Sequence, residues 1–173
     1  MDALKAINTR RSIRRYKNKK IPASIVKQLI EAGRNAPSAF NSQPWVFILI
    51  KKIETKKIIV KAKGGGDFIA TAPLVIACCY DQTKSKSKYH DIENVAVATE
   101  NILLAVHALG LGACYLGGFD PETPSVEKMI SESLKLPEHI KLVNLISIGY
   151  PDEKPIKKKK RPLSEITRKE TYK

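Results

Sequence analysis

The segment that most constrains the fold runs from Asp91 to Leu109, with the sequence DIENVAVATENILLAVHAL. It has the pattern of a long helix, and its second half is apolar on nearly every side. A helix without a polar face has to be covered by other elements. We therefore expect this helix at the centre of the fold, ending at Gly110-Leu111-Gly112.

Shorter segments on both sides alternate between helical and strand patterns. Helices are predicted over residues 2–8, 24–36, 54–63 and 123–136, and strands over 44–51, 73–80, 113–116 and 140–150. Asp2 and Ser24 are candidate N-caps, because their side chains can accept a hydrogen bond from the first helical turn. The order α, α, β, α, β, α, β, α, β predicts an α/β or α+β sandwich with a four-stranded sheet.

Two of these segments carry more local information. In the last strand Leu142, Asn144, Ile146 and Ile148 alternate, so we expect them on one face of the sheet. The triplet Gly64-Gly65-Gly66 lacks the Lys-Ser/Thr pair of a phosphate loop, and it is therefore predicted to be a helix stop or a flexible loop.

The charge balance points to an anionic partner. The chain has 173 residues, a length that favours one domain with its own core, and its formal net charge is +14. Such an excess suits a nucleic acid, an anionic membrane surface or a phosphate-bearing small molecule. No apolar stretch approaches the ~20 residues that span a bilayer. The N-terminus does not read as a secretory signal, so we expect a cytoplasmic protein with no membrane partner.

The residue types that usually carry catalysis are scattered. Cys78, Cys79 and Cys114 lie in apolar surroundings and form no metal-binding pattern, so they are interpreted as buried small side chains and no metal is expected. Of the three histidines, His107 falls in the apolar helix and is interpreted as a core or interface residue. If the chain is an enzyme, a cofactor is expected to supply its chemistry.

Two segments have the composition of a binding site. In RRSIRRY the side chains of Arg10, Ser12 and Arg14 would point the same way from an extended backbone and could converge on an anion, although a solvated basic face is an equal alternative. The loop APSAFNSQPW places the amides of Asn41 and Gln43 before a hydrophobic strand, which suits a flat ring with polar edges.

Four motifs together resemble the nitroreductase family of FMN-dependent oxidoreductases: RRSIRRY, APSAFNSQPW, LGLGACYLGGF and KKKKRPLSEI, in the family's order and spacing from Arg10 to Ile166. The resemblance implies an α+β sandwich whose central, mostly antiparallel sheet is flanked by helices. It also implies a single domain over 1–173 and an intertwined homodimer with FMN at the interface. The basic extension over about 151–173 would then wrap the partner chain. In such a dimer NADH or NADPH reduces the FMN, and an acceptor reoxidises it in a ping-pong cycle.

The resemblance also assigns residues, while the flavin carries the chemistry and no catalytic side chain is expected. The motif that holds the phosphate, ribityl chain and pyrimidine edge of FMN is matched by Arg10, Arg11, Ser12 and Arg14. The loop that reaches the flavin from the partner chain comprises Pro37, Ser38, Ala39, Asn41 and Gln43. Beside flavin N5 lie Leu116, Gly117 and Gly118, with the Gly118 amide as donor. The tail contacts the phosphate through Lys160 and Arg161, with Lys158 as the alternative register.

The chain also departs from the family pattern. Some relatives have a Glu where this chain has Gly117, and some have Asn and Lys where it reads Gly64 to Asp67. The stretch between Tyr80 and the long helix is short, whereas larger relatives insert helices there that cover the substrate. An open cleft and loose specificity for nitroaromatic, quinone or similar acceptors are therefore expected.

Two other classes of function stay open at this point. A flavin-binding or storage protein without turnover would have the same motifs. A nucleic-acid-binding module would show salt-sensitive binding and no cofactor. Few aromatics lie among the basic residues and no RRM, KH or zinc-finger pattern is present, so no nucleic-acid partner is expected.

Overall fold

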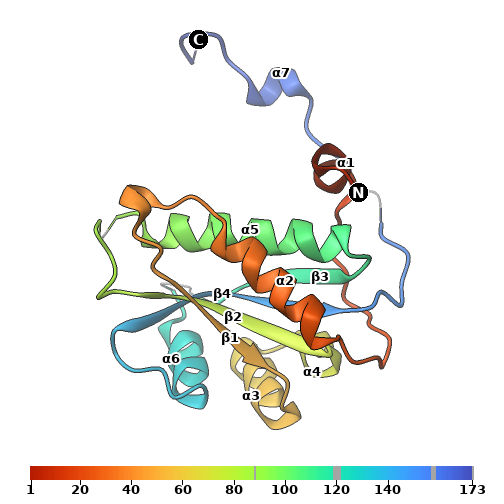
Figure 1. Ribbon diagram of the computed structural model, residues 1–173, viewed down its shortest axis with the longest axis vertical. Coiled ribbons are helices and arrows are strands. Elements are labelled where there is room, and N and C mark those ends of the chain that lie inside the picture. Colours follow the sequence, from red (N-terminus) through yellow and green to blue (C-terminus); the bar gives the residue numbers. More distant parts are fainter. Residues whose placement is uncertain (88, 119–121, 157–158, 173) are drawn as a thin grey trace.

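The computed structural model describes residues 1–87, 89–118, 122–156 and 159–172. Figure 1 shows a sheet with helices on both faces. The helices are α1 (Ala3–Thr9), α2 (Ala23–Arg34), the 3₁₀ turn η1 (Ala39–Asn41), α3 (Ile53–Lys63), α4 (Phe68–Thr71), α5 (Asp91–Ala108), α6 (Pro124–Ser133) and α7 (Leu163–Ile166). The strands are β1 (Trp45–Ile50), β2 (Leu74–Asp81), β3 (Gly112–Gly117) and β4 (Ile140–Gly149).

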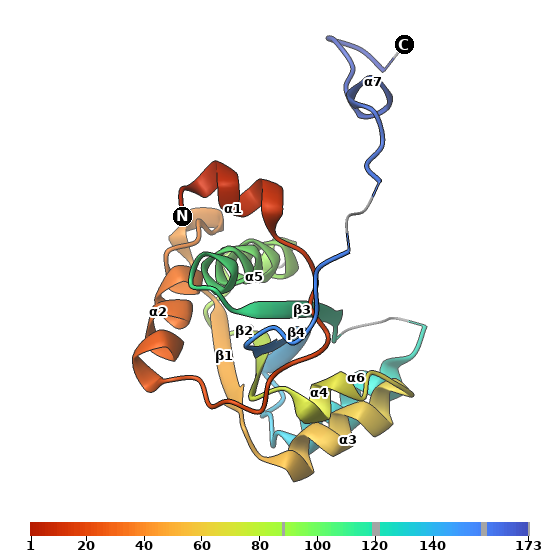
Figure 2. The same cartoon turned by 90° about the vertical axis from the view of Figure 1, so that its right-hand side faces the viewer.

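The four strands form one antiparallel sheet in the order β1-β2-β4-β3. Helices α1, α2 and α5 lie on one side of this sheet, and α3, α4 and α6 lie on the other (Figures 1 and 2). The predicted order of elements and the α+β sandwich are therefore confirmed. The sequence patterns did not predict the short elements η1, α4 and α7.

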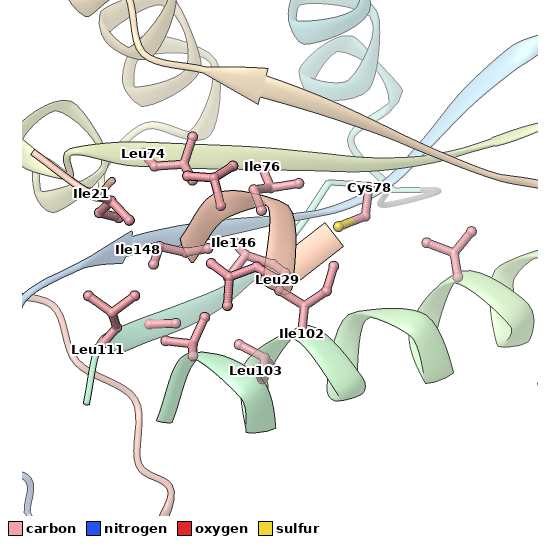
Figure 3. Packing of buried hydrophobic residues seen from close by; sticks show 14 of the residues in the cluster. Ile21, Leu29, Leu74, Ile76, Cys78, Ile102, Leu103, Leu111, Ile146 and Ile148 are labelled. Carbon is pink, nitrogen blue, oxygen red and sulfur yellow. The ribbon is translucent and has the colours of Figure 1, made fainter. Parts of the chain in front are cut away.

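Each face of the sheet has its own hydrophobic core. On the α5 side, Leu29 of α2 and Ile102 of α5 pack with Ile146 of β4, and all three are fully buried (Figure 3). On the other side, Ile59 of α3 and Ile130 of α6 pack against the sheet and are equally buried. The sheet is thus covered on both faces, as its nearly continuous apolar strands require.

The central helix α5 is covered less completely than its composition suggests. Its buried residues, among them Ile102 and Val106, face the sheet and α2. In its first half Ile92 is 49% exposed and Val97 is 42% exposed. The expected central position of this helix is confirmed, and these two apolar side chains remain partly in solvent.

A β-bulge changes which side chains of β4 share a face. Cys78 pairs with Asn144 and Cys79 with Leu142, so one residue of β4 is left over between them. An extra residue reverses the alternation on one side of the bulge. Ile146 and Ile148 belong to the core under α5, whereas Leu142 belongs to the opposite core. The prediction that Leu142 shares their face is wrong for this reason.

Several local predictions are confirmed and one is wrong. The Asp2 carboxylate accepts a hydrogen bond from the Lys5 amide at 2.9 Å and caps α1. Gly64 ends α3 in the left-handed conformation, with φ +62°. Ser24, in contrast, lies inside α2, because the Pro22 carbonyl already accepts the first helical hydrogen bonds. All three cysteines are buried and free.

Candidate functional site

The segment after α1 lies along the outer edge of β3. Ser12 forms a parallel bridge with Ala113, and the Ile13 amide donates to the Ala113 carbonyl at 2.9 Å. Gly112 permits this approach, since a Cβ there would come within 2.8 Å of the Ile13 side chain. The parallel pairing is limited to this bridge, because Tyr16 already bridges Pro151, just beyond the end of β4.

A basic cavity of about 310 Å³ opens where this segment meets the chain that follows β4. Its lining residues are Arg10, Arg11, Ser12, Arg14, Glu153, Lys154, Pro155 and Ile156. Four cationic side chains and a hydroxyl face one carboxylate. This donor set suits a phosphate, because guanidinium groups bind phosphate oxygens in pairs.

Contacts within the cavity hold its basic groups in place. The Arg10 Nε atom is buried and makes no hydrogen bond to any residue that the structure describes, although it lies 3.4 Å from Glu100 Oε1. Arg11 Nη1 donates to the Arg10 carbonyl at 2.6 Å. Glu153 Oε1 accepts from the amides of Arg14 at 2.5 Å and Arg15 at 3.3 Å. These contacts hold the arginine segment and Glu153 in place around the cavity.

Glu153 belongs to a second contact between the same two segments. Tyr16 bridges Pro151, and the Asp152 amide donates to the Arg15 carbonyl at 2.9 Å. Figure 2 shows the red segment after α1 beside the blue segment after β4. Sequence reasoning missed Glu153 and Lys154, because only the pairing of these distant segments brings them to the arginines.

The far end of β3 offers backbone groups on its free edge. The Gly118 amide donates inward to the Val143 carbonyl at 3.0 Å. Residues along an antiparallel strand alternate between bonding the partner and facing away. Gly117 therefore turns its amide and carbonyl outward, and its carbonyl accepts a hydrogen bond from Lys63 Nζ at 2.5 Å. The outward amide in this segment is that of Gly117, whereas the expectation named that of Gly118.

Two further groups stand at this end of the strand. The Arg14 guanidinium carbon lies 5.9 Å from the centre of the Phe68 ring, a cation–π distance. Leu116 packs into the core on the α3 side. Lys63, Phe68 and Gly64 to Asp67 thus lie near the arginine segment, and the sequence pattern did not single out Lys63 or Phe68.

The loop from Pro37 to Gln43 is held at the other end of α5. The Ala39 amide donates to Asn94 Oδ1 at 3.0 Å, in the first turn of α5. Within the loop the Gln43 amide donates to Ser38 Oγ at 3.0 Å, and Gln43 Nε2 donates to Asn41 Oδ1 at 3.1 Å. The loop is ordered by its own polar side chains.

A single chain does not bring this loop to the basic cavity. Near the carboxyl end of α5, His107 Nε2 and Thr9 Oγ1 are 2.7 Å apart, beside the arginines. Asn94 lies 13 residues earlier on the same helix, which corresponds to about 20 Å at 1.5 Å per residue. The loop is therefore held near the amino end of α5, whereas the arginine segment and the preceding Thr9 contact the second half of the helix, at Glu100 and His107.

His107 is half-buried, as expected for a core or interface position. Burial is the main cause that lowers its pKa, and the charges of Arg10 and Arg11 lower the pKa further. Thr9 donates its hydroxyl hydrogen to the Lys5 carbonyl, so the imidazole Nε2–H donates to Thr9. His107 thus supports α1 beside the arginine segment.

The basic tail lies away from the sandwich. Lys160 and Arg161 are exposed, and α7 projects beyond the body of the molecule (Figures 1 and 2). Lys157 and Lys158, like Phe119 of the LGLGACYLGGF motif, fall outside the described residues. The structure does not bring Lys160 and Arg161 to the cavity of their own chain.

Within the described ranges, none of the helices has both the length and the apolar composition to cross a membrane. Among the same residues, no three His, Cys, Asp or Glu side chains come together as metal ligands would.

Comparison with known proteins identifies the family. The model of the Nitroreductase family matches residues 7–64 and 57–150. This chain belongs to the nitroreductase family. A candidate NADH dehydrogenase/NAD(P)H nitroreductase of Archaeoglobus fulgidus is 39% identical over 155 residues, with 88% of each chain covered.

Solved structures agree with this membership. An FMN-dependent nitroreductase of Clostridium difficile is 30% identical, with a TM-score of 0.84 over 98% of this chain and 99% of that one. A candidate nitroreductase of Desulfovibrio desulfuricans, solved in complex with FMN, is also 30% identical, with a TM-score of 0.87 over 100% and 99%. The nitroreductase fold expected from the sequence motifs is therefore confirmed.

Proposed function

We propose that this chain binds FMN and passes reducing equivalents from NAD(P)H to a nitroaromatic, quinone or similar acceptor by a ping-pong cycle. Its family membership makes it an FMN-dependent NAD(P)H oxidoreductase. The observation that supports the proposed site best is the basic cavity, which opens where the arginine segment bridges the outer edge of β3.

The residues of the cavity fit the phosphate end of FMN. Arg10, Arg11, Ser12 and Lys154 would hold the phosphate, since they supply cations and a hydroxyl around one hollow. Arg14 would lie towards the pyrimidine edge, where its charge stabilises the negative charge of the reduced ring. When bound, FMN supplies the hydride and electron transfer. The protein supplies orientation and a positive field.

The free edge of β3 offers backbone groups that suit the flavin ring of FMN. Leu116, Gly117 and Gly118 form this end of the strand, and the Gly117 amide is the donor that faces outward. Gly118 keeps the turn close to the sheet, because a Cβ there would come within 2.9 Å of Leu142. We assign the N5 contact to the Gly117 amide and a supporting role to Gly118.

A homodimer would complete the site. The loop with Pro37, Ser38, Ala39, Asn41 and Gln43 is held at Asn94, about 9 Å along α5 from Glu100 and about 20 Å from His107, the two contacts of the arginine segment and the preceding Thr9 of its own chain. A second copy, packed antiparallel along α5 over the partly exposed Ile92 and Val97, would bring its loop to this cavity. Lys160 and Arg161 would likewise reach the phosphate in the partner's cavity, as the basic extension wraps around it.

The first experiment is the visible absorption spectrum of the purified protein, before and after FMN and then NADH or NADPH are added without oxygen. Flavin bands that bleach with the nucleotide, and return when a quinone or nitroaromatic is added, are the expected result. Bands that bleach and do not return with any acceptor would leave a flavin-storage protein. A protein that stays colourless with FMN would refute the proposal.

A further inference from the structure

We propose that Lys63 is a positioning residue for the proposed flavin site, because it holds the Gly117–Gly118 end of β3 in the conformation that turns the Gly117 amide outward. This inference rests on the proposed function. It adds a residue that neither the family motifs nor the arginine segment supplies.

The end of β3 needs an external hold. Gly117 and Gly118 are adjacent glycines, and glycine loses more conformational freedom on ordering than any other residue. On the inner side, the Gly118 amide is tied to the Val143 carbonyl at 3.0 Å. On the outer side, the Gly117 carbonyl is tied to Lys63 Nζ at 2.5 Å. The Gly117–Gly118 peptide is therefore held from both sides of the strand.

Lys63 is itself well placed to act as this tie. It is the last residue of α3, directly before the left-handed Gly64. The preceding turn of α3 is anchored by Ile59, which is fully buried in the core under the sheet. A hydrogen bond with a charged donor is stronger than one between neutral groups. The tie thus connects a rigid helix to a flexible strand end.

The hydrogen bond from Lys63 to Gly117 also determines which polar groups the free edge of β3 presents to a ligand. With the Gly117 carbonyl bonded to Lys63, this edge offers the ligand a backbone amide and an ammonium group. Arg14 adds a third donor nearby, through its position against Phe68. Such an edge favours an acceptor atom or a negative charge on the bound ring, and Lys63 keeps it preorganised.

The test compares three variants of the whole protein. Lys63→Met removes the ammonium group and keeps the apolar stem, and Lys63→Arg restores a charged donor. Lys61→Met is the matched control, since Lys61 is an exposed lysine two residues earlier on α3. Thermal unfolding shows first that each variant is folded.

The first readout is hydrogen exchange of the Gly118 amide, which needs no flavin. We expect exchange about fivefold to tenfold faster in Lys63→Met, wild-type exchange in Lys61→Met and recovery in Lys63→Arg. The second readout is the dissociation constant for FMN, which should rise by a similar factor in Lys63→Met only.

The outcomes separate this inference from the function on which it rests. If wild-type protein binds FMN while Lys63→Met matches Lys61→Met in both readouts, Lys63 holds nothing and the inference is wrong. If Lys63→Met weakens FMN binding with unchanged Gly118 exchange, Lys63 acts by charge alone and the positioning role is also wrong. If wild-type protein binds no FMN, the proposed function fails and the role of Lys63 at that site fails with it, even where Gly118 exchange shows the tie.

Discussion

Replacement of Gly118 by alanine should destabilise the protein as well as disturb the proposed ring site. A Cβ at this position would lie 2.9 Å from Leu142 Cγ, 3.0 Å from Leu142 Cδ2 and 3.2 Å from the backbone Cα of Asn144. Leu142 is only 1% exposed, so its side chain has little room to give way. Overpacking of this kind costs about 1–3 kcal/mol. For a chain of this size, about 2 kcal/mol lowers the Tm by about 4–8 °C.

The assay is thermal and urea unfolding of flavin-free protein, because bound FMN would add its own stabilisation. Gly65→Ala is the matched control, since a Cβ there meets nothing within 4 Å and Gly65 has no positive φ. Leu142→Ala should relieve part of the clash, so the Gly118→Ala/Leu142→Ala double variant should be less destabilised than the sum of the single changes. A Gly118→Ala protein as stable as Gly65→Ala, or strictly additive changes, would refute the reasoning.

Three other predictions concern the site, the second chain and the core. Arg14→Ala should weaken FMN binding about tenfold or more, since a charge-assisted contact is lost, whereas Arg15→Ala should bind FMN as the wild type does. Fluorescence titration measures the dissociation constant of each variant, and equal constants for the two variants would remove the role of Arg14. Val97→Lys, at a partly exposed apolar position of α5, should yield monomers in light scattering and little bound FMN in the absorption spectrum, and an unchanged dimer would place the interface elsewhere. Burial raises the pKa of the Cys78 and Cys79 thiols to about 12, so thiol reagents at pH 8 should label both only after unfolding.

The helix and strand patterns of the sequence predicted the fold, because the elements that they favour locally are also the elements that pack together in the folded chain. The helix and strand patterns, the Asp2 cap and the Gly64 stop depend on residues within a turn or two, and the structure retains them. The bulge in β4 was not predictable in this way. Its effect on Leu142 arises from the pairing with Cys78 and Cys79, which lie more than sixty residues earlier.

The site was predictable only in part for the same reason. The motifs named Arg10, Arg11, Ser12 and Arg14, and these four residues do line one cavity. Glu153, Lys154 and Lys63 reach the same region from other segments, and no short motif marks them. The direction of a backbone amide is likewise set by strand pairing. The hydrogen bond from Gly118 to Val143, which turns Gly117 outward, therefore required the structure.

The division of the proposed site along α5 gives a physical reason for two chains. The loop is held next to Asn94, and the arginine segment, with the preceding Thr9, contacts the second half of the helix at Glu100 and His107. Because α5 is rigid, these contacts keep the loop and the arginine segment of one chain about 9–20 Å apart along the helix axis. On α5 the side chains of Ile92 and Val97 remain partly exposed, and apolar groups left in solvent can be buried by a partner. A second copy packed antiparallel along α5 would bury these side chains and bring its loop to the arginine segment in the same step.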